Sequence, residues 1–159
     1  MRYRHLLART TARYLRVRPD GIEIAPDPQP RTSLTVQIFE HAPARTCYQN
    51  RRPVCRSLDG RRALDHPNQH CRDCPLRPQC TPQIRLSLLV GDTPYQLLLA
   101  FTSARNFLAY LAEVERRGQH LANVPTRIRI INHHAWGEVR FEITGREGGP
   151  NGLNQDETA

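Results

Sequence analysis

Apolar and polar residues alternate along several short segments of the chain, and a two-residue period is typical of β-strands that bury one face. In one such segment, Leu34, Val36 and Ile38 fall on the same side. Two further segments alternate in the same way: residues 126–131 and 138–144, with Trp136-Gly137 at the turn between them. Two apolar runs also flank Gly91-Asp92: residues 84–90 and 95–101. The pattern therefore predicts a first strand followed by two hairpins.

The remaining segments have more turn-forming residues. Residues 15–24 alternate around Pro19-Asp20-Gly21, which predicts a short N-terminal hairpin. Residues 25–30 contain three prolines and predict a linker, while residues 42–59 are rich in arginine and predict a loop. From Gly145 onward the chain has four glycines and few apolar residues, which predicts a disordered tail.

One segment has a helical period instead. Between Phe107 and Val114, apolar side chains recur every three or four residues. Thr102-Ser103 offers an N-cap before this segment, and Gly118 offers a C-terminal stop after it. The pattern predicts a helix over residues 103–117, placed between the two hairpins.

The charge of the chain is strongly basic and uneven. Its 159 residues carry a net charge of +8, and all 23 basic residues are arginine. Residues 1–80 hold the whole excess, because residues 81–159 contain eight arginines and eight acids. Six arginines surround the acid Asp59: Arg45, Arg51, Arg52, Arg56, Arg61 and Arg62. Such a patch favours a polyanionic partner, and no apolar run is long enough to span a membrane.

Four cysteines within this basic region have the spacing of a metal site. Cys55, Cys71, Cys74 and Cys80 follow the pattern C-x15-C-x2-C-x5-C. The CxxC pair lets two thiolates of one turn reach a single ion, and four thiolates suit a structural Zn²⁺. We therefore expect a zinc loop over residues 55–80.

Three alternatives to this ligand set remain open. Cys47 could replace Cys55, and His66 or His70 could replace one cysteine. Disulfides would require an oxidising compartment. The arginines near the N-terminus interrupt any secretory signal, so we expect a cytoplasmic protein with reduced thiols.

The number of strands and the position of the helix fit a mainly β (α+β) fold. The architecture that we expect is a small antiparallel barrel of the oligonucleotide-binding (OB) type, with one helix and the inserted zinc loop. A two-layer α+β sandwich is compatible with the same elements. We expect three parts: residues 1–30 as a basic N-terminal arm or hairpin with a proline-rich linker, 31–145 as an OB-like nucleic-acid-binding domain with the zinc loop, and 146–159 as a disordered tail.

A single-stranded nucleic acid needs exposed aromatic rings as well as cations. Tyr48, Tyr95 and Trp136 are the candidates for stacking, and Arg127 and Arg129 could extend the cationic track along one strand face. Core positions are expected instead for the phenylalanines Phe101, Phe107 and Phe141.

Catalytic signatures are absent from the sequence. His133 and His134 are adjacent, so in an extended segment they point to opposite faces and do not share a metal. No HExxH, GxSxG or P-loop motif occurs, and no H-x-E precedes the paired cysteines. We therefore expect a binding protein without enzymatic activity.

Two resemblances bear on this region. Residues 71–80 resemble the C-x2-C-x5-C end of the iron–sulfur loop in endonuclease III-type DNA glycosylases, which makes an iron–sulfur cluster the second cofactor candidate. In that loop a further cysteine stands where this chain has Leu64.

The stretch from Arg45 to Tyr110 resembles small zinc-containing single-stranded-DNA-binding proteins of phages, plasmids and mobile integrative elements. The matching pieces are residues 52–60, residues 71–75, Cys80 and the helix that starts at Thr102-Ser103. The resemblance implies an OB-like fold that binds single-stranded DNA, with RNA as a possible ligand. A zinc-containing adaptor, or a subunit of a larger nucleoprotein complex with a protein partner, is the alternative.

Overall fold

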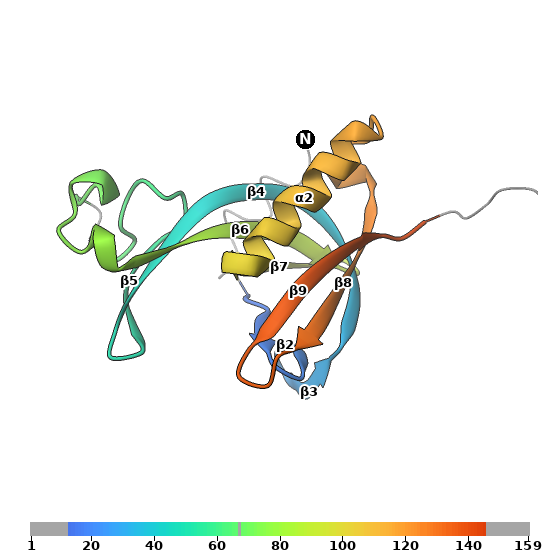
Figure 1. Cartoon of the computed structure of the whole chain (residues 1–159), viewed down its shortest axis with the longest axis horizontal. Coiled ribbons are helices and arrows are strands. Elements are labelled where there is room, and N and C mark those ends of the chain that lie inside the picture. The colour runs from blue at the N-terminus through green and yellow to red at the C-terminus, as the bar shows by residue number, and fades with distance from the viewer. Residues whose placement is uncertain (1–12, 67, 146–159) are drawn as a thin grey trace, which may run out of the picture.

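The computed structural model describes residues 13–66 and 68–145, which form two antiparallel sheets and one α-helix (Figure 1). The smaller sheet contains β1 (Arg16–Arg18), β2 (Gly21–Ile24) and β3 (Asp27–Arg31). The larger contains β4 (Ser33–Gln49), β5 (Arg52–Ser57), β6 (Cys80–Val90), β7 (Thr93–Ala100), β8 (Pro125–Asn132) and β9 (Gly137–Ile143). The helix is α2 (Phe101–Arg116), and the short 3₁₀ helices are η1 (Cys71–Asp73), η2 (Arg77–Gln79) and η3 (Leu121–Asn123).

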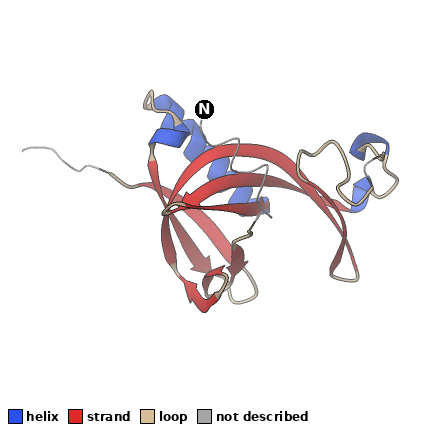
Figure 2. Cartoon of the chain, turned by 180° about the vertical axis from the view of Figure 1, so that it is seen from behind, coloured by secondary structure: helices blue, strands red, loops and turns tan. Residues whose placement is uncertain are grey.

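The long strand β4 connects two parts of the molecule. Its residues 33–37 pair with β8, residues 37–47 with β6, and residues 45–49 with β5. Figure 2 shows β4 and β6 running together as a curved ribbon away from the rest of the sheet. The ribbon ends in the loop that carries η1 and η2. We call residues 42–85 the outer lobe and the other described residues the body.

One hydrophobic core holds the body together. On α2 the side chains of Phe107, Tyr110 and Val114 are buried and face the sheet residues. The strands contribute aliphatic side chains: Leu34, Val36 and Ile38 of β4, Leu86 and Leu88 of β6, Leu97 and Leu99 of β7, Ile128 of β8 and Val139 of β9. Leu15, Ile22 and Ile24 of the N-terminal hairpin belong to the same core. Each large apolar side chain buried in this way stabilises the fold by about 1.5–3 kcal/mol.

The three hairpins predicted from the pattern of apolar residues are present in the structure. Val17 and Ile22 pair across the N-terminal hairpin, and β6–β7 and β8–β9 are the two later hairpins. Gly118 ends the helical region as expected, with φ of 67° and its N–H donating to the carbonyl of Glu115 at 2.8 Å.

Two segments predicted to lack regular structure are strands. Residues 25–30 were expected to be a linker, but most of them belong to β3, at the edge of the smaller sheet. Proline has no N–H to donate, and at an edge this leaves the ladder of hydrogen bonds intact. The predicted loop over residues 42–59 is also wrong, because β4 continues to Gln49 and β5 pairs with it. The buried positions of that part of β4 are the small residues Ala44, Thr46 and Cys47, which give no apolar pattern.

The start of the helix differs from the expected cap. Ala100 occupies the N-cap position and makes no side-chain cap hydrogen bond. The Ser103 hydroxyl instead accepts a hydrogen bond from the N–H of Val139 at 3.0 Å. Because Ser103 already lies inside the helix, it joins α2 to β9 rather than capping the helix.

The mainly β class with one helix is confirmed, but a closed barrel is not formed by the residues described. The larger sheet has the order β7-β6-β4-β8-β9, and β7 and β9 at its two ends do not pair with each other. The predicted tail from residue 146 and the first twelve residues lie outside the described part of the chain. None of the described helices has the length and apolarity needed to cross a membrane.

Candidate metal centre and nucleic-acid interface

Three strands of the outer lobe place cysteines side by side. Cys47 of β4 is the register partner of Cys55 in β5 and of Cys80 in β6. Directly opposed residues of antiparallel strands point to the same face of a sheet, with Cβ atoms about 4.5–5.5 Å apart. The three thiols therefore form a row, with Cys47 at its centre and only 1% exposed.

The other two cysteines come from the turn η1. The N–H of Cys74 donates to the carbonyl of Cys71 at 3.3 Å, which closes the turn of the CxxC pair. The N–H of Cys71 donates to the carbonyl of Arg61 at 2.8 Å and ties this turn to the preceding part of the loop. At the end of the loop, where β6 begins, the thiol of Cys80 donates to the carbonyl of Leu76 at 3.4 Å.

These five thiols line one small cavity. It has a volume of about 20 Å³, and its lining also includes Ala63, Leu76 and three arginines of the outer lobe. A volume of this size holds about one water-sized sphere. All five cysteines are free thiols in the structure. The cavity therefore gathers sulfur donor atoms of the kind that a thiophilic metal ion prefers.

The environment raises the pKa values of two of the thiols, Cys55 and Cys80. Burial raises the pKa of Cys80 to about 11, and the neighbouring Cys47 thiol adds to the effect. The pKa of Cys55 is raised, first by burial and then by the negative charge of Asp65 and the surrounding thiols. In the absence of a cation, these two groups hold their protons at neutral pH. A bound metal ion would reverse this, because a coordinating thiol is deprotonated.

The structure places each predicted ligand, while the metal itself stays a prediction. Cys55, Cys71, Cys74 and Cys80 all line the cavity. Among residues 13–66 and 68–145, no group of three or more His, Cys, Asp or Glu side chains is arranged to hold a metal as it stands. His66 and His70 are exposed and are not part of the cavity lining.

The loop of the outer lobe is shaped by one carboxylate. The Asp59 carboxylate accepts hydrogen bonds from the N–H groups of Arg61 at 2.7 Å and Arg62 at 3.0 Å, and from the Ser57 hydroxyl at 3.1 Å. The two backbone bonds lower the pKa of Asp59, because they stabilise its charged form. The charge of Asp59 is thus used to hold the backbone, and the guanidinium groups of both arginines are exposed.

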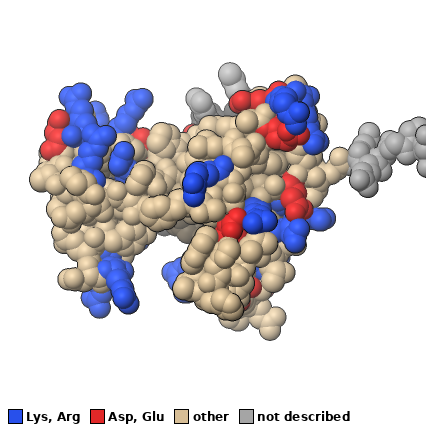
Figure 3. All heavy atoms as spheres, in the orientation of Figure 1, with Lys and Arg blue, Asp and Glu red and all other residues tan. Residues whose placement is uncertain are grey.

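The arginines predicted to bind nucleic acid gather on the outer lobe. Arg45 is half-buried, and the other five are exposed: Arg51, Arg52, Arg56, Arg61 and Arg62. None of the six forms an ion pair with any residue of the described ranges. Figure 3 shows that the charged atoms of the lobe on the left of the view are mainly basic, whereas basic and acidic atoms are mixed on the right.

The arginines of the body are mostly neutralised by carboxylates. Arg129 pairs with Glu142 at 2.8 Å, so one of the two predicted track residues on β8 carries a compensated charge. Arg127, the other, is exposed on the same strand. The available positive charge is therefore concentrated on the outer lobe.

The aromatic candidates divide clearly by exposure. Tyr48 is 44% exposed and Trp136 is 45% exposed, so their rings are accessible. Tyr95 is buried in the core, so the structure contradicts its assignment as a stacking residue. Phe107 and Phe141 pack in or against the core as expected. Phe101 was expected there too, but its side chain is 72% exposed.

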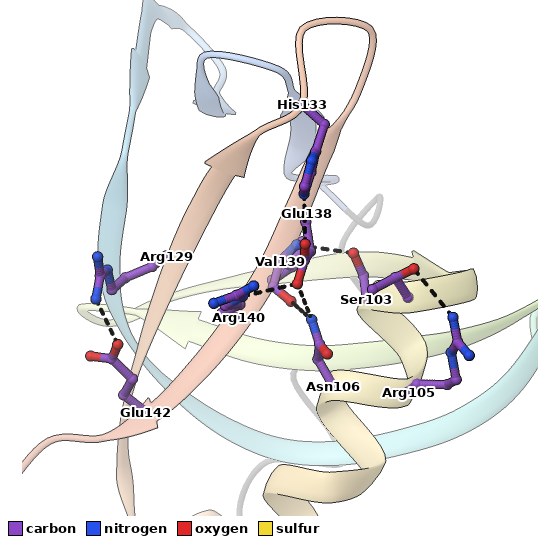
Figure 4. A network of polar contacts seen from close by, with 10 residues as sticks. Ser103, Arg105, Asn106, Arg129, His133, Glu138, Val139, Arg140 and Glu142 are labelled. Atoms are coloured by element: carbon purple, nitrogen blue, oxygen red, sulfur yellow. Dashed lines mark hydrogen bonds and ion pairs between the residues drawn. The ribbon is translucent and has the colours of Figure 1, made fainter.

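A polar network that the sequence did not indicate fastens the β8–β9 hairpin to α2 (Figure 4). The buried carboxylate of Glu138 accepts hydrogen bonds from Arg140 and Asn106, both at 2.9 Å, and contacts the His133 ring at 2.7 Å. These partners, Arg140 first, lower the pKa of Glu138 to about 2. Asn106 also donates to the carbonyl of Val139 at 2.9 Å. The network fixes the hairpin whose turn carries Trp136.

Comparison of the chain with models of known protein families, with curated proteins and with solved structures gave no match. The geometry and charge of the two regions are therefore the basis for assigning a function.

Proposed function

We propose that the protein binds single-stranded nucleic acid, DNA in the first place, through the outer lobe, and that a structural zinc ion orders this lobe. The observation that carries the proposal is that one small lobe combines a thiol-lined cavity with exposed arginines that form no ion pair with a described residue. Guanidinium groups bind phosphates in a fork geometry, and Tyr48 adds a ring on which a base can stack.

Zinc is the metal that fits this cavity best. Zn²⁺ takes four thiolates in a tetrahedron and needs no redox partner. The CxxC turn supplies Cys71 and Cys74, and the flanking strands supply Cys55 and Cys80. Bound there, the ion would cross-link β5, β6 and η1. An iron–sulfur cluster is the competing cofactor, and a metal assay distinguishes the two.

The arrangement supports binding rather than chemistry. The carboxylates of Asp59 and Asp65 accept hydrogen bonds from backbone N–H groups, and that of Asp73 pairs with Arg72. The thiols line a cavity of only about 20 Å³. The arginines would neutralise phosphates, so affinity should fall steeply as salt rises.

The test is a fluorescence-anisotropy titration of the purified protein with labelled single-stranded DNA, matched duplex and single-stranded RNA at two salt concentrations. Metal content is measured on the same sample by mass spectrometry. One zinc per chain and salt-dependent binding that favours the single strand would support the proposal. The matched control for Cys74→Ser is Cys47→Ser, a substitution in the same cavity outside the proposed ligand set. Loss of zinc in the first and retention in the second is expected.

A protein-interaction adaptor is the second candidate, because the outer lobe also exposes Val54 and Leu64, at 39% and 56%. Equal, weak binding to every polyanion, together with a bound zinc, would favour this candidate over the first.

A further inference from the structure

The start of α2 exposes an aromatic ring at an energetic cost. Phe101 has φ of 48°, in the left-handed region that a bulky residue rarely adopts. Its ring is 72% exposed, so burial does not offset the strained backbone. Strained residues of this kind cluster at active sites and ligand-binding sites. The observation suggests that the exposed ring has a role outside the fold.

A second exposed ring lies across the same groove. Trp136 is in the turn between β8 and β9, and its indole stacks on the His133 ring, with the ring centres 4.4 Å apart and the planes 15° from parallel. Because His133 also contacts Glu138, this stack is fixed to the polar network of Figure 4. Trp136 therefore presents a pre-positioned ring rather than a freely rotating one.

The two rings line one largely apolar groove of about 430 Å³. Its walls include Leu98 and Ala100 of β7 and Val139 of β9. The volume is in the range of about 300–1,000 Å³ that is typical of ligand pockets. Flat rings at the mouth of an apolar groove suit a flat aromatic ligand, which can stack on them.

The start of α2 and the β8–β9 turn, which contribute the two rings, lie on the side of the body that faces the outer lobe (Figure 1). Figure 3 shows a hollow between this lobe, on the left, and the part of the body below α2, with basic atoms on both walls. The turn between β4 and β5 is the lower end of the outer lobe (Figure 1), with Arg51 in the turn and Arg52 at the start of β5. A ligand in the groove that carries phosphates on both sides would have them within this positive field.

We infer that the groove between Phe101 and Trp136 binds an unpaired base of a single-stranded nucleic acid, while the outer lobe binds its phosphates. This inference rests on the proposed function and adds to it a base-binding site in the body. Stacking depends on the π-face of the base, so the site should accept every base with modest preference.

The experiment uses Trp136 as its reporter, because it is the chain's one tryptophan. The full-length protein is titrated with a single-stranded oligonucleotide and with an abasic oligonucleotide of the same length and charge. Quenching of Trp136 by the first and not by the second is expected. Equal fluorescence changes with both would overturn the inference.

Phe101→Gly is the decisive variant, because glycine adopts a positive φ without strain. We expect its thermal stability to equal or exceed that of the parent, while its affinity for the base-bearing oligonucleotide falls at least about fivefold. Phe101→Asn, which also tolerates this conformation, serves if the glycine variant is poorly folded. The matched control is Leu108→Ala, an exposed apolar position of the same helix outside the groove.

The outcomes separate the inference from the proposed function. Unchanged affinity of Phe101→Gly, with parent-like binding of both oligonucleotides, would overturn the base site and leave the outer lobe as the nucleic-acid interface. Absence of any single-strand binding by the parent would overturn both. The fluorescence of Trp136 is also measured at several protein concentrations without oligonucleotide. A change with concentration would mean that a second copy of this chain covers the groove, and this would overturn the inference.

Discussion

The body and the outer lobe of this protein are stabilised by different means. The body buries large side chains such as Phe107, Leu97 and Ile128 in one continuous core. The outer lobe has no comparable core among its described residues, since its buried side chains are Ala44, Thr46, Cys47, Ser57 and Ala63. Instead of a large apolar core, it has hydrogen-bonded strands, the Asp59 carboxylate that holds the loop, and five thiols around a small cavity.

This difference shows why a metal ion would act on one part only. Small buried residues stabilise a fold weakly, and a segment without enough apolar surface needs a cross-link. The binding free energy of a structural zinc would therefore be folding free energy for the outer lobe. The body, which has its own core, should fold with or without it. Substitutions in each region can test this contrast.

The largest effect is expected from Phe107→Ala. Phe107 is fully buried and makes edge-on contacts with His41 and Phe141. Its truncation should cost about 3–5 kcal/mol, a large part of the stability of a domain of this size. Chemical denaturation followed by circular dichroism measures the loss. Leu108→Ala, exposed on the same helix, should change stability by less than about 0.5 kcal/mol.

Cys74→Ser should act on the outer lobe alone. If zinc orders this lobe, the variant should lose the metal and expose residues 42–85 to protease, while the core of the body keeps its protection in hydrogen exchange. Nucleic-acid affinity should fall at least about tenfold, as expected when several arginines stop binding phosphates together. Removal of metal from the parent by a chelator should reproduce the pattern. If the outer lobe of the metal-free protein still resists protease, a metal ion is not what stabilises this lobe, and the proposed difference between the two regions is wrong.

Glu138 should make the body sensitive to acid. Its pKa is about 2 in the folded protein, below the ordinary value of 4.5. A carboxyl with a lowered folded pKa contributes stability above pH 4.5, and this contribution is lost as pH falls toward 2. Glu138→Gln should lose about 1.5–3 kcal/mol at neutral pH and show a flatter stability profile between pH 4.5 and 2. Thermal unfolding at a series of pH values checks this, and parallel profiles for parent and variant would contradict it.

The smallest effect concerns charge. In the double variant Arg51→Gln/Arg52→Gln, the slope of log affinity against log salt should decrease by about 0.7 for each phosphate that is no longer neutralised. Stability should change little, because both side chains are exposed and form no ion pair with a described residue. Arg129→Gln is the matched control in the body, since that guanidinium is paired with Glu142. Equal changes in both variants would mean that the outer lobe is not the preferred phosphate site.

With the exception of β3, the strands of the body were predicted from the sequence and those that run through residues 42–59 of the outer lobe were not. In the body, burial of alternate apolar residues is what makes a strand stable, so the pattern in residues 34–38 and 126–131 predicts β4 and β8 directly. In the outer lobe, the strands pair through small and polar residues, and the same pattern predicted a loop for residues 42–59. The strand β3 was missed because its prolines indicate a linker unless the strand is known to be at an edge.

The sequence by itself determined the mainly β composition with one helix, the excess of arginine before residue 81, and the four spaced cysteines. These properties are local, since they depend on residue type and spacing. Only the tertiary structure decided that Cys47 stands between Cys55 and Cys80, that Tyr95 is buried and that Phe101 is exposed. Each of these depends on which strands lie side by side, and strand pairing is set by the burial of the whole core rather than by neighbours in the chain.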